Sequence, residues 1–129
     1  MHQNEEMVRR FYAAFSSGDG EALTTLMAPD IVWSSPGNSQ ISGDHKGRDE
    51  VLALFGLCGE LTQGNLSVEL LSINVAADGT VVTVHRVKGE RDGNSLDVLE
   101  TETGTIEDGH IARVEEGYSN QAASDDFWA

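Results

Sequence analysis

The first half of the chain shows apolar residues at helical spacing. Across residues 7–17 they recur at i, i+3, i+4 and i+7, which places Val8, Phe11, Tyr12 and Phe15 on one face. Asn4 is the expected N-cap of this helix, and the pair at 18–19, Gly-Asp, ends it. A short second helix is expected at 21–27, where Pro29 ends it.

A short strand at 31–33 and a polar loop at 34–47 follow. Long ordered loops tend to lie over binding sites, so this loop is a candidate cover for one. A third helix is expected from about 49 to 61, with an apolar face formed by Val51, Leu52, Leu54, Phe55 and Cys58.

From residue 65 onward the period changes to that of strands. Four runs rich in Val, Ile, Thr and Leu cover residues 66–77, 80–91, 95–107 and 110–119. Each separator contains Asp-Gly, a strong signal for a two-residue hairpin turn. The pattern predicts an α+β domain in which a curved antiparallel sheet wraps around helices, with its cavity between the concave face and the first and third helices.

Composition narrows the classes of partner. The chain has 129 residues, enough for one domain spanning 1–129. Its net charge of −14 repels phosphate backbones and anionic lipids, so neither nucleic acid nor a membrane is an expected partner. The single cysteine, Cys58, cannot form an internal disulfide, and its apolar neighbours predict a buried thiol. Without a signal-peptide pattern or a membrane-length apolar run, a cytoplasmic location is expected.

The run at 95–107 contains two glutamates in phase with its apolar residues. Glu100 and Glu102 therefore share the face of those residues. Desolvation and mutual repulsion raise the pKa values of such carboxyls, so one can hold a proton near neutral pH and act as a general acid or base. The alternative is that both point to solvent or pair with a nearby basic residue: Arg86, Lys88 or Arg113.

His85 is a candidate partner for these glutamates. If residues 92 and 93 form the turn, paired positions sum to 185, so His85 faces Glu100 and lies diagonal to Glu102. A carboxylate fixes the tautomer of an imidazole and raises its basicity, which suits a proton relay. A slip of one residue places Arg86 opposite Glu100 instead and makes a structural salt bridge.

Further residues are candidates for substrate binding. Trp33 and Phe55 supply aromatic surface, and the Tyr12 hydroxyl can reach the same cavity, although all three also suit a plain core. His45 lies in the polar loop, which can cap the pocket.

The last run adds Glu116 and Tyr118, which share a face with Val114 and Ala112. In the alternative, the other face of this strand points to the cavity, and that face carries Ile111, Arg113, Glu115 and Gly117. The tail that follows carries Phe127 and Trp128, which are expected to pack on the domain or on a partner subunit.

Four segments in the same order carry a resemblance to a known family. They are VRRFYAAFSSGDGEALTTLMAPDIVW at 8–33, GDHKGRDEVLALF at 43–55, VVTVHRVKGERDGNSLDV at 81–98 and IEDGHIARVEEGYSNQAA at 106–123. Together they resemble the nuclear transport factor 2-like superfamily and, within it, the SnoaL-like and ketosteroid-isomerase-like proteins. The resemblance implies a cone-shaped fold, a single SnoaL-like domain over 1–129 and a homodimer formed through the open face of the sheet.

The ketosteroid isomerase pattern is incomplete in this sequence. Those enzymes place an oxyanion-stabilising tyrosine and a proton-abstracting aspartate where this sequence has Phe11 and Ser35. Phenylalanine donates no hydrogen bond and an unactivated serine is no base, so steroid isomerisation by that mechanism is disfavoured. Their third polar position, an acid on the penultimate strand, has a counterpart near Glu102. The Asp-Arg-Asp arrangement of the epoxide hydrolases finds no clear match.

No cofactor and no metal are expected. The sequence lacks a phosphate-binding glycine loop, a GxSxG elbow, a dinucleotide fingerprint, an HExxH motif and paired Cys/His spacings. The residues and the resemblance favour a cofactor-free acid–base enzyme, an isomerase, cyclase or dehydratase-type lyase. Its expected substrate is a small hydrophobic carbonyl compound, such as a polyketide-like metabolite. The alternative is a non-catalytic small-molecule-binding or assembly module of the same fold.

Overall fold

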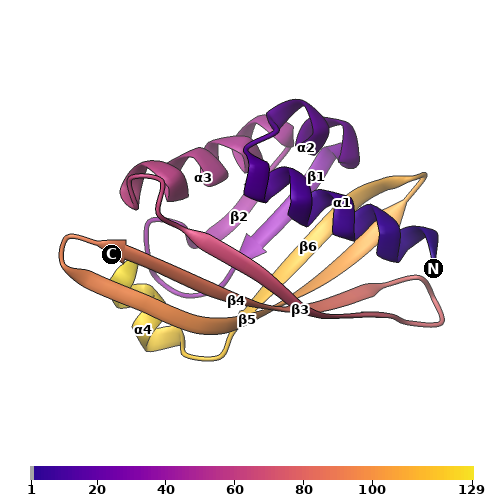
Figure 1. Ribbon diagram of the computed structural model, residues 1–129. Helices are drawn as coiled ribbons and strands as arrows, with labels where there is room; N and C mark the ends of the chain where they lie inside the picture. Colours follow the sequence, from indigo (N-terminus) through magenta and orange to yellow (C-terminus); the bar gives the residue numbers. More distant parts are fainter. Residues whose placement is uncertain (1) are drawn as a thin grey trace.

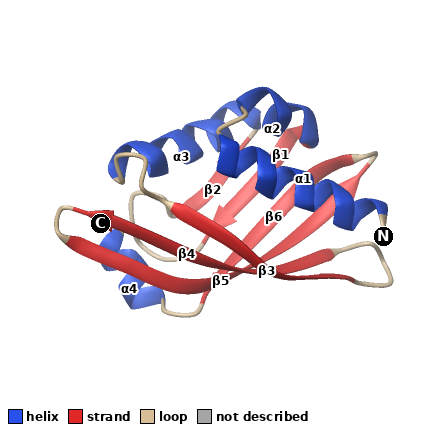
Figure 2. Ribbon diagram, viewed as in Figure 1, coloured by secondary structure: helices blue, strands red, loops and turns tan. Residues whose placement is uncertain are grey.

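A curved six-stranded sheet organises the protein, and the computed structural model describes residues 2–129 (Figure 1). The helices are α1 (Gln3–Ser17), α2 (Gly20–Leu26), α3 (Arg48–Leu61) and α4 (Gln121–Phe127). The strands are β1 (Met27–Ser35), β2 (Gly43–Lys46), β3 (Ser67–Val75), β4 (Val81–Arg91), β5 (Asn94–Glu107) and β6 (His110–Tyr118). The strand order is β2-β1-β6-β5-β4-β3. Figure 2 shows α1, α2 and α3 together on one side of the sheet, with α4 apart from them, beside β5. The α+β prediction is confirmed.

Local sequence explains how α1 passes into α2. Gly18 ends α1 in the left-handed region, at φ 71°, where glycine carries no steric penalty. The Asp19 side chain then accepts a hydrogen bond from the Ala22 N–H and caps α2. The other end of α1 differs from the prediction, because His2 rather than Asn4 is the N-cap and the helix begins earlier.

Two of the three Asp-Gly pairs form the predicted turns. Asp92 and Asp108 have φ values of 51° and 50°, and the glycines after them also have positive φ, as a type I′ hairpin requires. The pair at 78–79 is different, because it lies within a longer connection at 76–80. There the Asp78 side chain accepts from the Thr80 N–H, so the two-residue turn predicted at this point is wrong.

The turn at 92–93 sets the register of β4 against β5. His85 lies directly opposite Glu100, and Arg86 lies opposite Leu99. The slipped register with Arg86 facing Glu100 is therefore not the one adopted. Arg86 instead points to the outer face, where its guanidinium makes two hydrogen bonds of 2.7 Å to Asp97.

The region before α3 departs from the sequence prediction. The predicted loop at 34–47 contains β2, which pairs antiparallel with β1. β1 is longer than the predicted strand and runs parallel to β6, so the sheet is mixed. Pro29 stands within β1, where the pairing with β6 shifts register and a missing backbone N–H is tolerated.

The C-terminal segment folds back on the same chain. The tail after the last predicted strand, to which the sequence assigned no element, forms α4, which Asn120 caps through a hydrogen bond from the Ala123 N–H. Phe127 and Trp128 are buried in the core, which decides between the two packing partners expected for them. Within residues 2–129, no helix has the length and apolar character needed to cross a membrane.

Candidate active site

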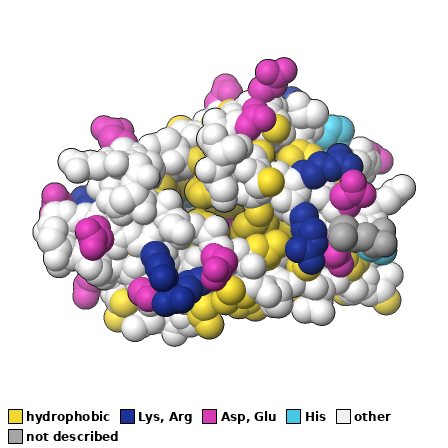
Figure 3. Space-filling model, in the orientation of Figure 1, with side chains coloured by type: hydrophobic (Ala, Val, Ile, Leu, Met, Phe, Trp, Pro, Cys, Tyr) yellow, Lys and Arg dark blue, Asp and Glu magenta, His cyan; other side chains and the backbone are white. Residues whose placement is uncertain are grey.

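A cavity lies between the sheet and the helices α1 and α3. It measures about 630 Å³, including its open mouth. Its walls are mainly apolar, with aromatic rings contributed by Phe11, Phe15, Trp33, Phe55 and Trp128. Figure 3 shows hydrophobic side chains in the hollow at the centre of one face of the molecule. A mainly apolar lining with a few polar groups is typical of a small-molecule site.

The polar wall of this cavity comes from three adjacent strands. Side chains alternate between the two faces of a strand, so His85 on β4, Glu100 and Glu102 on β5, and Glu116 and Tyr118 on β6 all point inward. The predicted parity of β6 is therefore observed from Val114 to Tyr118. Ile111 also faces inward, contrary to the prediction, because the pairing of β5 with β6 shifts register at this end of the strand. In the ladder, Glu100 pairs with Tyr118 and Glu102 pairs with Glu116. Residues from distant parts of the sequence meet here because the register aligns them.

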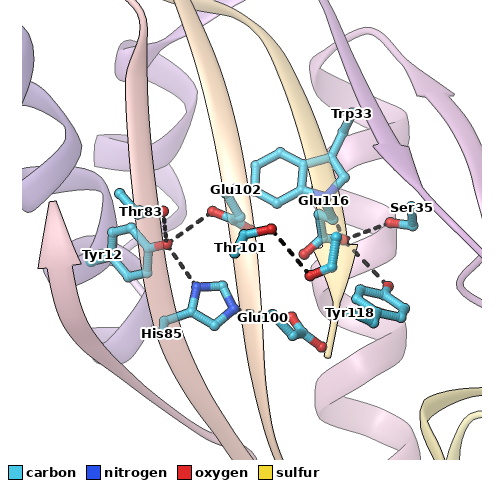
Figure 4. A network of polar contacts seen from close by, with 11 residues as sticks. Tyr12, Trp33, Ser35, Thr83, His85, Glu100, Thr101, Glu102, Glu116 and Tyr118 are labelled. Carbon is cyan, nitrogen blue, oxygen red and sulfur yellow. Dashed lines mark hydrogen bonds and ion pairs between the residues drawn. The ribbon is translucent and has the colours of Figure 1, made fainter. Parts of the chain in front are cut away.

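Tyr12 on α1 connects two of these strands (Figure 4). Its hydroxyl lies 2.7 Å from Nδ1 of His85, 2.8 Å from Oγ1 of Thr83 and 3.0 Å from Oε1 of Glu102. Burial, and then the negative charge of Glu102, raise the pKa of Tyr12. The hydroxyl therefore keeps its proton at neutral pH and serves as a donor and acceptor within the network.

His85 and Glu100 form a buried acid–base pair. Nε2 of His85 lies 3.0 Å from Oε1 of Glu100, and the two residues are only 3% and 6% exposed. Burial raises the pKa of Glu100, and the hydrogen bond from His85 opposes that shift. The pair thus holds the imidazole in a fixed orientation against Tyr12.

Glu102 and Glu116 are two carboxyl groups placed side by side with unequal support. Glu116 Oε1 lies 2.7 Å from the Ser35 hydroxyl and 3.1 Å from Nε1 of Trp33, and it accepts a hydrogen bond from each. Glu102 accepts only from Tyr12 among the described residues. Burial, and then the neighbouring charge of Glu116, raise the pKa of Glu102 well above 4.5. Glu116 is therefore the carboxyl with the greater hydrogen-bond support, and Glu102 is the one whose protonated form is favoured by its surroundings.

The structure brings most of the predicted site residues together. Those lining the cavity are Glu100, Glu102, Glu116, His85, Tyr12, Trp33, Phe55 and Tyr118. His45 is not among them. It lies on β2, where Nε2 is 2.9 Å from the Ile41 carbonyl oxygen, because its segment pairs with β1 instead of folding over the cavity.

Sequence reasoning did not assign the site roles of Ser35, Thr83 and Trp128. The inward alternation of β1 through Trp33 to Ser35 was a usable signal for the first of these. Trp128 has no such signal, because its place depends on how the C-terminal helix packs. Cys58 also lines the cavity, and burial raises its pKa to about 12, which keeps the thiol protonated.

Three of the inward residues could offer atoms to a metal ion. One ligand atom from each of His85, Glu102 and Glu116 lies within 4.8 Å of the others. Both nitrogens of the His85 ring already have hydrogen-bond partners, Tyr12 and Glu100. A metal ion would have to displace one of them, so the geometry suits a hydrogen-bond network better than a preformed metal site.

The chain belongs to the SnoaL-like domain family, which matches residues 8–114. Its fold is that of the nuclear transport factor 2-like proteins, as the resemblance implied. The uncharacterized protein Rv0034 of Mycobacterium tuberculosis is 36% identical to it over 124 residues, which are 96% of this chain and 95% of that protein.

Two solved structures show how far the similarity extends. Bal32a, from a soil-derived mobile gene cassette, has 41% identity and a TM-score of 0.96, covering 98% of this chain and 97% of its own. A putative polyketide cyclase from Sinorhizobium meliloti has 26% identity and a TM-score of 0.73, covering 91% of this chain and 100% of its own. The similarity therefore spans nearly the whole chain in each case.

Proposed function

We propose that the cavity catalyses proton transfer on a small hydrophobic carbonyl compound without a cofactor. The reaction class is that of an isomerase, a cyclase or a dehydratase. Glu102 is the general acid–base, and His85 supports it through Tyr12. Membership of the SnoaL-like family and the similarity to a putative polyketide cyclase support this reaction class.

The observation that carries the proposal is the position of the Tyr12 hydroxyl between Glu102 and His85. When Glu102 is protonated, it donates to the Tyr12 oxygen, and Tyr12 donates to Nδ1 of a neutral imidazole. Shifting both protons along these hydrogen bonds gives a Glu102 carboxylate and an imidazolium, which the Glu100 carboxylate stabilises. Tyr12 therefore lets Glu102 exchange its proton with His85 inside the cavity.

In the proposed reaction the Glu102 carboxylate removes a proton from the carbon next to the carbonyl group. The electron pair of the broken C–H bond moves into the carbonyl group and forms an enolate. The Tyr118 hydroxyl is 3.5 Å from Glu116, too long for a strong hydrogen bond, so it is available to donate to the enolate oxygen. Return of the proton to another carbon gives an isomer. Attack of the enolate carbon on a second carbonyl group gives a ring.

The rival reading, a binding module without catalysis, fits the site less well. Its simplest version has Glu100 and Glu102 facing solvent or neutralised by basic residues. Both glutamates instead line the cavity, and their partners among the described residues are His85 and Tyr12 rather than a lysine or an arginine. A carboxyl group whose pKa is raised by burial beside an apolar cavity is typical of an acid–base catalyst.

Hydrogen–deuterium exchange tests the proposal without knowledge of the natural substrate. Small apolar ketones, with benzylacetone as the first, are incubated in heavy water, and exchange next to the carbonyl group is followed by NMR. We expect exchange above the buffer rate and a loss of about 10²–10⁴-fold in Glu102→Gln. The matched control is Glu115→Gln, since Glu115 is exposed on the outer face of the same strand as Glu116. Exchange at the buffer rate for every ketone, or an unchanged rate in Glu102→Gln, contradicts the proposal.

We also propose that the protein forms a homodimer through the outer face of the sheet. Three large apolar side chains are exposed on adjacent strands: Leu71, Val82 and Leu99, with exposed fractions of 49%, 38% and 44%. Such a patch favours association. Light scattering is expected to give twice the chain mass for the wild type and the mass of one chain for Leu99→Lys. A wild type that stays monomeric at micromolar concentration contradicts this proposal.

A further inference from the structure

The charge of the cavity is one-sided. Three glutamates and one histidine line it, and no lysine or arginine of residues 2–129 is part of the lining. The proton shift through Tyr12 moves charge between Glu102 and His85 but leaves the total unchanged. Negative charge therefore remains in excess inside the cavity in either arrangement, as it does over the whole chain, with a net charge of −14.

Glu100 adds a second, independent feature. It is only 6% exposed, yet His85 at Oε1 is the one hydrogen-bond partner its carboxyl group has among the described residues. Its second oxygen has no protein donor and is not sealed off from solvent, since it is not among the fully buried unpartnered atoms of the described residues. Because Glu100 lines the cavity, this oxygen is an open acceptor for a ligand that brings a donor. Figure 4 shows this carboxylate beside His85, on the strand next to Tyr118.

The facing walls are aromatic. The rings of Phe11 and Trp33 are stacked with centroids 5.9 Å apart, and the Phe55 ring meets Trp33 edge to face at 5.1 Å. A cation gains electrostatic attraction over the face of an aromatic ring, most strongly over tryptophan. Carboxylates and aromatic rings in one cavity act on a cation in the same direction.

We propose that this cavity selects apolar molecules that carry a positive charge, such as a protonated or quaternary amine. The inference rests on the proposed function only in placing the ligand in the same cavity. The cationic group lies at the free oxygen of Glu100, and the apolar body lies against Trp33 and Phe55. The surplus of negative charge disfavours carboxylates and phosphates and steers cations to the mouth.

This placement also predicts the spacing of groups within a substrate. Glu100 and Glu102 are two residues apart on one face of β5, a distance of about 7 Å along an extended strand. A ligand anchored by its cation at Glu100 therefore presents to Glu102 an atom about 7 Å away. An amino ketone with that separation satisfies both groups at once.

Calorimetric titration with three probes of equal length tests the inference: phenylbutylamine, phenylbutanol and phenylbutyrate. At neutral pH we expect the amine to bind the wild type at least about tenfold more tightly than the alcohol, and the carboxylate not to bind. Equal or tighter binding of the alcohol overturns the inference, as does failure of the amine to bind. This comparison uses the wild-type chain alone, so it does not depend on any variant folding.

The variant Glu100→Gln tests whether the Glu100 carboxylate causes the preference for the amine. Glutamine keeps an oxygen for His85 but carries no charge, so the preference for the amine is expected to fall to within about threefold of the alcohol. The control Glu115→Gln loses the same charge on the outer face and is expected to keep the preference. An intact preference in Glu100→Gln, or its loss in Glu115→Gln, overturns the assignment.

The exchange assay keeps this inference separate from the proposed function. Glu102-dependent exchange into benzylacetone, together with equal affinity for the amine and the alcohol, refutes cation selectivity alone. Preference for the amine without ketone exchange supports the ligand class and refutes the proposed catalysis.

Discussion

Two pairs of oppositely ionisable side chains join β4 to β5, one on each face of the sheet, and they differ in how much solvent reaches them. His85–Glu100 lies on the cavity face, at 3.0 Å, with side chains 4% and 7% exposed. Arg86–Asp97 lies on the outer face, at 2.7 Å, with side chains 41% and 52% exposed. The outer pair has the shorter and doubled contact, yet solvent screens it. The inner pair is shielded from solvent and contacts the Tyr12 hydroxyl. Burial and the nearby Glu116 carboxylate raise the pKa of its Glu100 member.

Replacing one member of each pair by alanine is expected to lower the free energy of unfolding by different amounts. His85→Ala leaves the buried Glu100 without its partner and is expected to lower the free energy of unfolding by about 3 kcal/mol. Arg86→Ala removes an exposed pair and is expected to cost less than about 1 kcal/mol. Urea denaturation of both variants measures the difference. Equal losses would show that burial does not distinguish the two pairs.

Removing the link between the inner groups is expected to affect rate more than stability. Tyr12→Phe deletes the hydroxyl that joins Glu102 to His85, and we expect ketone exchange to fall by about a hundredfold. Thr83→Val removes a neighbour of that hydroxyl but keeps the link, so its loss is expected to stay within about tenfold. Exchange kinetics in heavy water compare the two variants, and a larger loss in Thr83→Val contradicts the relay.

The two faces are expected to respond to pH with opposite signs. The folded-state pKa of Glu102 lies above its ordinary value of 4.5, so as pH rises the unfolded chain loses this proton first. The free energy of unfolding therefore falls from about pH 4.5 up to the raised pKa. Asp97 has a lowered pKa, caused by its hydrogen bond from Arg86, so its contribution is present above 3.8 and is lost as pH falls through the lowered value.

Urea unfolding across pH checks both signs. Glu102→Gln is expected to reduce the decline above about pH 4.5 and leave the part that comes from Glu100, whose pKa is also raised, whereas Asp97→Asn is expected to alter only the acid end. The Asp97 effect is the smallest expected here, because that carboxylate is exposed. A Glu102→Gln variant with the pH dependence of the wild type would refute the raised pKa.

The sequence was enough to predict which side chains of β4 and β5 face the cavity and how the two strands pair, because both features depend on local sequence. The two-residue period places Glu100 and Glu102 on one side, and the Asp-Gly turn at 92–93 fixes which residue faces His85. β2 and α4 were not predicted because both are short. β2 has four residues, most of them polar, and α4 has seven, so neither shows enough periodicity to indicate an element.

The links within the site were less accessible to sequence reasoning. Tyr12 and Glu102 are separated by 90 positions, and their contact depends on how α1 packs across β4 and β5. The support of Glu116 by Trp33 and Ser35 depends on the parallel pairing of β1 with β6, which no local pattern indicates. His45 shows the opposite error, since a loop assignment placed it at a cavity that its strand does not reach.

The most direct test of the account is a carboxyl NMR titration of Glu102 in the protein without ligand. We expect its midpoint to lie well above 4.5, and to move down in Glu116→Gln, because the neighbouring charge that opposes its ionisation is then absent. A midpoint at or below 4.5 would mean that Glu102 holds no proton at neutral pH, and the proposed acid–base chemistry would have lost its central group.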